Sequence, residues 1–178
     1  VQAIAHYWLG RYARAEDCAQ FAMNALPQST TGWFAALGHL AMARSRSGKI
    51  ERLAEEAIVL EGAKGSSRLG AGHIVAVCRL AVTMTHAGSL VAARQIVRSI
   101  RDRMDRQADE AVVYAWLDVA FAERAAFVGD LARELSRRTS ALEPFTAAGD
   151  LRNACQERAH LGAAYLRVGA FEDALRVL

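Results

Sequence analysis

Five glycines recur along this chain at nearly constant spacing, and this period constrains the fold more than any other feature. The intervals are 38, 40, 41 and 40 residues, and the glycines are Gly10, Gly48, Gly88, Gly129 and Gly169. Self-similarity at a period of about 40 residues is typical of stacked structural repeats. The sequence therefore predicts an array of similar units, each packed on its neighbours.

The residues around each glycine follow one local pattern. Seven residues before it the side chain is small, at Ala3, Ala41, Ala81, Ala122 and Gly162. Two residues after it the side chain is large and apolar, at Tyr12, Ile50, Leu90, Leu131 and Phe171. Five residues after it four units place Ala or Leu, and the fourth unit places Glu134. A glycine ends a helix without Cβ strain, and small residues let two helices approach closely. Each glycine is thus predicted to join the two helices of a hairpin.

The fold class expected is all-α, because alanine and leucine dominate and no hairpin-like strand pattern occurs. We expect first helices at 1–9, 30–46, 68–86, 108–127 and 150–167. We expect second helices at 12–25, 50–62, 90–105, 130–142 and 171–178. Residues 62–70 are predicted to form a loop, and Pro144 is predicted to break the fourth second helix.

The whole chain, residues 1–178, is interpreted as a single repeat domain. Its expected units are 1–27, 28–66, 67–106, 107–149 and 150–178, of which the first and last are partial. The chain lacks an initiating Met and both ends fall inside helical patterns, so we expect a fragment of a longer protein.

Composition narrows the function classes. The net charge of +3 comes from scattered arginines, so no nucleic-acid partner is expected. No apolar run is long enough for a membrane span, so membrane insertion is not expected. The odd number of cysteines predicts buried free thiols and a cytoplasmic location. No metal-ligand spacing or nucleophile–base pair occurs, so we expect no cofactor and no enzyme activity.

The pattern resembles the tetratricopeptide repeat (TPR) family. The last unit carries the resemblance best, with Leu161-Gly162, Tyr165, Gly169 and Ala174. The first unit carries its second half, with Gly10, Ala15, Ala22 and Pro27. The resemblance implies a right-handed α-solenoid of antiparallel helix hairpins. Units of about 40 residues are also similar to arrays in large bacterial signalling proteins, where they follow a Ser/Thr kinase or STAND-type ATPase domain outside the array.

In that family ligands lie in the concave groove formed by the first helices. Positions at fixed distances before each turn glycine are predicted to line this groove. Most of the residues at these positions are apolar, and a few have polar side chains. The candidate protein- or peptide-binding residues are Tyr7, Met42, Ser45, Val82, Thr85, Trp116, Glu123, Gln156 and Leu166. An apolar groove suits an amphipathic helix or an extended peptide. We therefore expect a non-catalytic scaffold or sensor module of a multidomain bacterial signalling protein.

Two alternatives remain open at this point. The groove could be filled by another part of the same protein, which would make the array a structural, oligomerisation or autoinhibitory element. Solenoids also need polar terminal units. Truncated ends would expose apolar hairpin faces, so self-association through the repeat ends is expected as well.

Overall fold

In the computed structural model, which describes residues 1–63, 70–101 and 110–178, every regular element is a helix and no strand occurs among these residues. The elements are α1 (Gln2–Trp8), α2 (Tyr12–Ala25), α3 (Thr31–Arg46), the 3-10 helix η1 (Ile50–Arg52), α4 (Leu53–Gly62), α5 (Ala71–His86), α6 (Leu90–Arg101), α7 (Ala111–Phe127), α8 (Leu131–Ala147), α9 (Leu151–Arg167) and α10 (Phe171–Val177). The all-α expectation is confirmed. Most of the predicted 62–70 loop and the end of the 90–105 helix lie outside the described residues.

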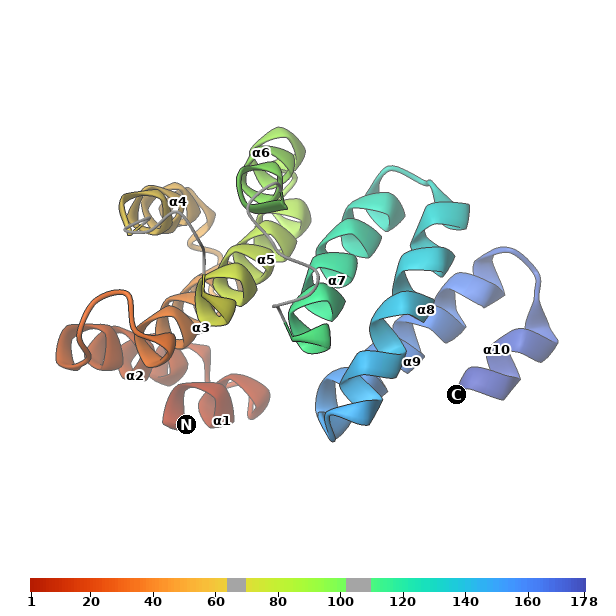
Figure 1. Cartoon of the computed structure of the whole chain (residues 1–178), viewed down its shortest axis with the longest axis horizontal. Helices are drawn as coiled ribbons and strands as arrows, with labels where there is room; N and C mark the ends of the chain where they lie inside the picture. The colour runs from red at the N-terminus through yellow and green to blue at the C-terminus, as the bar shows by residue number, and fades with distance from the viewer. Residues whose placement is uncertain (64–69, 102–109) are drawn as a thin grey trace. The chain divides into compact units, whose positions relative to one another are not determined.

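The chain divides into two units, Val1–Ala108 and Asp109–Leu178. In unit 1, the central helix α3 packs on α1, α2, α4 and α5. The helix α1 packs on α2 as well, and α5 packs on α4 and α6 as well. Within this unit the first helices α3 and α5 lie side by side (Figure 1). In unit 2, α7 packs on α8, α8 on α9, and α9 on α10. Most helix contacts within each unit are therefore between helices that follow one another in the chain, and the contact of α3 with α5 joins neighbouring hairpins of unit 1.

All five predicted turn glycines adopt the left-handed backbone conformation, with φ between 70° and 79°. At Gly129 the glycine N–H donates to the carbonyl of Ala126 over 3.2 Å, and the N–H of Asp130 donates to Ala125 over 2.9 Å. The same pair of hydrogen bonds closes the other four turns. These bonds satisfy carbonyls that a helix end would otherwise leave unpaired. The predicted role of the glycines is confirmed.

Pro144 does not break the fourth second helix, because α8 continues through it to Ala147. The next residue, Phe145, is fully buried and packs edge-on against Trp116 with ring centroids 5.6 Å apart. Burial of this ring offsets the hydrogen bond that proline removes from a helix. The helix ends instead at Ala147, two residues before Gly149, a sixth turn glycine with φ 70°.

The helices that follow these turns begin almost at once. In unit 2 the residue after each turn glycine is itself the helix N-cap: Asp130 accepts from the N–H of Arg133 over 3.1 Å, and Asp150 accepts from Asn153 over 3.3 Å. A carboxylate at this position satisfies a free N–H and interacts well with the helix dipole. The connection between two helices is therefore only a few residues long.

Each unit has an apolar interior built from consecutive helices. Leu37, Leu40, Ile74, Leu80 and Ile100 are almost fully buried in unit 1, and Val113, Ala122, Phe145, Leu161 and Ala164 are buried in unit 2. Cys78 is buried as expected, but Cys155 is exposed on α9, so the expectation of three buried thiols was wrong there. No helix among the described residues is both long and apolar enough to cross a membrane.

Candidate functional site: buried arginine–glutamate clusters

The most distinctive polar feature of unit 2 is a buried arginine that contacts carboxylates from three helices. The guanidinium of Arg138 on α8 donates to Glu123 on α7 over 3.0 Å. It donates to Glu157 on α9 over 3.1 Å and to Glu134 on its own helix over 3.0 Å. These four side chains are at most one-tenth exposed. We call them, together with His160 and Arg167, the Arg138 cluster.

The remaining two members bring the charges of the Arg138 cluster close to balance. Arg167, near the end of α9, forms a short ion pair with Glu134. The Nδ1 atom of His160 lies 3.3 Å from a Glu123 oxygen and 3.0 Å from Arg138 Nη1. Three carboxylates therefore face two arginines and one titratable ring. Because isolated buried charges are costly, each member depends on the others.

The carboxylates control the protonation of both basic groups at the centre. Burial alone would lower the pKa of the Arg138 guanidinium, but the charges of Glu123 and Glu157 outweigh it and raise that pKa. Hydrogen bonds to Glu123 and Glu157 raise the pKa of His160 to about 9, despite partial burial and the nearby Arg138. His160 is therefore protonated at neutral pH and supplies the third positive charge.

Unit 1 contains a second buried arginine with a similar arrangement. Arg44 on α3 donates from Nε to Glu16 on α2 over 3.2 Å and forms a short ion pair with Glu56 on α4. Lys49 adds a second cation at 2.7 Å from Glu16. Burial would raise the pKa of Glu16, but Lys49 and Arg44 together lower it. Burial raises the pKa of Glu56, whose second oxygen has no hydrogen-bond partner, and Arg44 only partly opposes this rise.

In both units, a buried guanidinium therefore connects three helices. Five donors in a fixed fork allow arginine to serve several carboxylates at once, which lysine cannot do. Such buried ion-pair clusters hold helices in a fixed register rather than presenting a reactive group to solvent. Within the described part of the chain, no three His, Cys, Asp or Glu side chains are placed to hold a metal ion.

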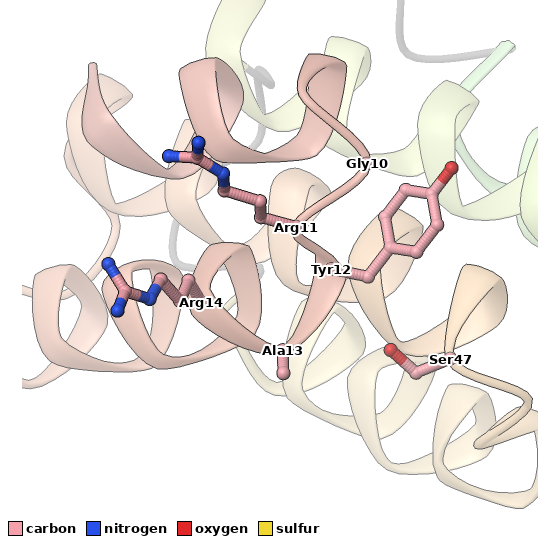
Figure 2. Close-up of a pocket in the computed structure, with 6 residues that line it drawn as sticks. All are labelled: Gly10, Arg11, Tyr12, Ala13, Arg14 and Ser47. Carbon is pink, nitrogen blue, oxygen red and sulfur yellow. The ribbon is translucent and has the colours of Figure 1, made fainter.

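A shallow pocket of about 710 Å³ lies at the turn between α1 and α2, lined by Gly10–Arg14 and Ser47. Figure 2 shows the guanidinium groups of Arg11 and Arg14 extending to one side, away from Tyr12 and Ser47. The cations and the ring do not converge on a common point. The pocket therefore lacks the converging polar groups typical of a small-molecule site.

The predicted binding residues occupy several environments. Tyr7, Met42, Ser45, Val82 and Trp116 are half-buried, whereas Gln156 and Leu166 are exposed. Thr85 is buried and its hydroxyl donates to the carbonyl of Ala81 over 2.9 Å. Glu123 belongs to the Arg138 cluster. The sequence prediction therefore included one member of the Arg138 cluster, Glu123. It did not identify Arg138, Glu134 and Glu157, or that these side chains contact one another.

Over the described residues the protein is all-helical, and buried ion pairs link α2, α3 and α4 in unit 1 and α7, α8 and α9 in unit 2. A model of the Alpha-E family, described as a predicted alpha-helical domain with a conserved ER motif, matches residues 2–177. The chain belongs to this family. No curated protein matches the chain.

This family assignment corrects the predicted resemblance to tetratricopeptide repeats, because the family model that matches almost the whole chain is not a TPR model. A turn glycine, a small residue at a helix crossing and a large residue after the turn are needed by any tightly packed helical hairpin. They indicate the hairpin but do not discriminate between families. The expected place in a bacterial signalling protein rested on that resemblance alone.

Three Glu-Arg dipeptides occur in this chain, at 51–52, 123–124 and 157–158. The glutamates of the last two, Glu123 and Glu157, are the two carboxylates that Arg138 contacts on neighbouring helices. Successive residues on a helix point about 100° apart. In these last two dipeptides the glutamate is buried in the Arg138 cluster, whereas Arg124 is half-buried and Arg158 is exposed; in the first dipeptide both residues, Glu51 and Arg52, are exposed.

Proposed function

We propose that the chain is a non-catalytic protein- or peptide-binding module. In this proposal the hairpins of unit 1 stack as a right-handed α-solenoid, and the ligand lies along the first helices α1, α3 and α5. The supporting observation is a repeated apolar position. Ile4, Met42 and Val82 each stand six residues before a turn glycine, and each is half-buried. Because α3 packs against both α1 and α5, these positions recur along neighbouring helices.

The chemistry of this first-helix face favours a ligand with apolar anchors. Tyr7 and Ser45 stand three residues before their turn glycines and are also half-buried, so they add two polar atoms beside the apolar side chains. Met adapts its shape to different partners, and tyrosine combines a large apolar surface with a hydroxyl group. An amphipathic helix or an extended peptide with two or three apolar anchors fits such a face.

A peptide selection tests the proposal without knowledge of the natural ligand. A random peptide library displayed on phage is selected against the chain, and enriched peptides are synthesised and titrated by fluorescence anisotropy. Met42→Glu and Val82→Glu should each weaken binding about tenfold or more, equivalent to about 1.4 kcal/mol. Met42→Ala, which removes contacts without adding charge, should weaken it in the same direction.

The matched control is Ile58→Glu, which changes an exposed apolar residue on the second helix α4. Peptide affinity should be the same for this variant as for the unchanged chain. Circular dichroism of all variants checks that the helices are retained. Failure to enrich any peptide, or equal weakening by Ile58→Glu, would contradict binding at the first-helix face.

A further inference from the structure

The three first helices of unit 1 carry no acidic side chain. No Asp or Glu occurs in α1, α3 or α5, whereas every acidic residue described in unit 1 lies on α2, η1 or α4. The arginines of the first helices are Arg44, Arg46 and Arg79. Arg44 is paired with Glu16 and Glu56, so Arg46 and Arg79 supply the remaining positive charge. A surface with charge of one sign favours a partner of the opposite sign.

Arg79 lies in the middle of the first-helix face. Val75, Arg79 and Val82 stand four and three residues apart on α5, so they share one side of the helix, and all three are half-buried. The stem of Arg79 crosses α3 at Gly38, because a Cβ atom added to this glycine would lie 3.2 Å from Arg79 Cδ. Arg79 therefore lies at the boundary between α3 and α5, with an apolar residue of α5 on each side of it.

A histidine nitrogen without a hydrogen-bond partner lies near this arginine. The ring of His39, the residue after Gly38, is half-buried, and its Nδ1 atom is buried and unpaired among the described residues. Burial, the positive charge of Arg79 on α5 and that of the amino terminus before α1 lower the pKa of His39 to about 3. The ring is therefore neutral at pH 7. A carboxylate at this place would gain an ion pair with Arg79 and a hydrogen bond from the ring.

Given the proposed function, on which this inference rests, we infer that the peptide ligand carries an Asp or Glu side chain between its apolar anchors and that Arg79 binds this carboxylate. The carboxylate belongs to an internal side chain and not to a chain terminus, because Val75 and Val82 extend the apolar surface to both sides of Arg79. Arg46 extends the positive charge to the end of α3, where its Nε donates to the Tyr7 hydroxyl over 3.4 Å. The ligand class is therefore an acidic amphipathic peptide.

The peptides enriched by phage selection against the chain test the charge requirement. They should share one Asp or Glu flanked by apolar residues. Replacing that residue by Asn or Gln in the synthetic peptide should weaken binding about tenfold, as expected for the loss of a hydrogen bond between charged groups. Amidation of the peptide's C-terminus should leave the affinity unchanged, because the terminal carboxylate is not the group that Arg79 binds.

A double-mutant cycle tests whether the carboxylate contacts Arg79. Arg79→Gln should weaken binding of the acidic peptide about tenfold and should hardly affect its amide analogue, because both changes remove the same contact. Arg94→Gln removes the same charge from an exposed position on the second helix α6, and this control should bind both peptides as the wild type does. Circular dichroism checks that both variants keep their helices.

The unchanged chain provides a second readout that does not depend on how the Arg79 variant folds. The acidic peptide should raise the pKa of His39 above its value of about 3 in the free chain, because a bound carboxylate favours the charged ring. The amide analogue should leave this pKa unchanged. An NMR titration of the His39 ring with each peptide measures the difference.

The possible failures are distinguishable. Enriched peptides that Met42→Glu weakens but that need no acidic residue would overturn the Arg79 contact and leave the proposed function intact. Losses from Arg79→Gln and from the amide analogue that simply add would overturn the contact as well. A loss of affinity on C-terminal amidation would overturn the assignment to an internal side chain. Failure to enrich any peptide would contradict the proposed function and the acidic ligand together.

Discussion

Arg138 on α8 donates from Nη1 to Oε2 of Glu157 on α9 over 3.1 Å, and both side chains are almost completely buried. The pair crosses from one hairpin of unit 2 to the next. Two further carboxylates share the same guanidinium, so the pair is the centre of a network and not an isolated ion pair. This relationship makes the stability of unit 2 unusually dependent on one arginine.

Replacing that arginine should destabilise the protein severely. Arg138→Met leaves Glu123, Glu134 and Glu157 buried without their shared cation, and breaking a buried ion pair in this way costs about 3–5 kcal/mol. Urea denaturation followed by circular dichroism measures the change in the free energy of unfolding.

The neighbouring arginine provides the matched control for this change. Arg137 is half-exposed and pairs with Asp118 over 2.6 Å. Arg137→Met should cost no more than about 1 kcal/mol, as for other solvent-exposed pairs. If both variants lost the same free energy of unfolding, the Arg138 cluster would contribute no more to stability than a surface ion pair does.

The stability of unit 2 should fall as the pH rises above neutral. The pKa of His160 is about 9 in the folded protein, against 6.5 for an ordinary histidine. Because the folded state holds this proton more tightly, the stabilisation is complete below about pH 6.5 and is lost as the pH rises through 9. Glu123, Glu157 and Arg138 are the charged groups facing the ring.

Two measurements check this pH dependence. An NMR titration of the His160 ring should give a pKa near 9. Urea midpoints between neutral and alkaline pH should fall more steeply for the wild type than for His160→Gln, which cannot titrate. A ring that titrates below neutral pH would show that Nδ1 accepts a hydrogen bond from Arg138 instead of donating to Glu123.

Alanine at a turn glycine should destabilise the hairpin through the backbone alone. Gly129 has φ 77° and no atom lies within 4 Å of the position its Cβ would take. Gly129→Ala should therefore cost about 1–2 kcal/mol, the penalty for a left-handed backbone with a Cβ. Gly62, the last residue of α4, also has open space around it but no positive φ. Gly62→Ala should be neutral or stabilising by up to about 1 kcal/mol, and urea denaturation compares the two.

The turns could be predicted from sequence because their requirement is local. A left-handed residue at a helix end strongly favours glycine, so the spacing of Gly10, Gly48, Gly88, Gly129 and Gly169 located five turns. The turn at Gly149 is not predicted from the sequence, because Pro144 predicts an earlier end of the helix. Only the tertiary packing of Phe145 against Trp116 explains why α8 continues past the proline.

The buried clusters could not be predicted in the same way. Charged side chains are usually exposed, and a single sequence does not indicate which ones pair across helices. One signal was present, since Glu134 stands where the other units place Ala or Leu. Glu134, Arg138, Ala141 and Phe145 share one buried helix face. Charged residues such as Glu134 and Arg138 on a buried helix face indicate that oppositely charged partners lie on the neighbouring helices. Only the packing of α7 and α9 against α8 identifies these partners as Glu123 and Glu157.

In the turns at Gly129-Asp130 and Gly149-Asp150, the turn glycine is followed directly by the N-cap residue of the next helix. The loops that join α7 to α8 and α8 to α9 are therefore very short. A single inserted residue inside one of these helices would rotate everything beyond it by about 100° and carry Glu123, Arg138 or Glu157 away from its partners. Length variation in unit 2 should therefore be tolerated only as the gain or loss of complete hairpins.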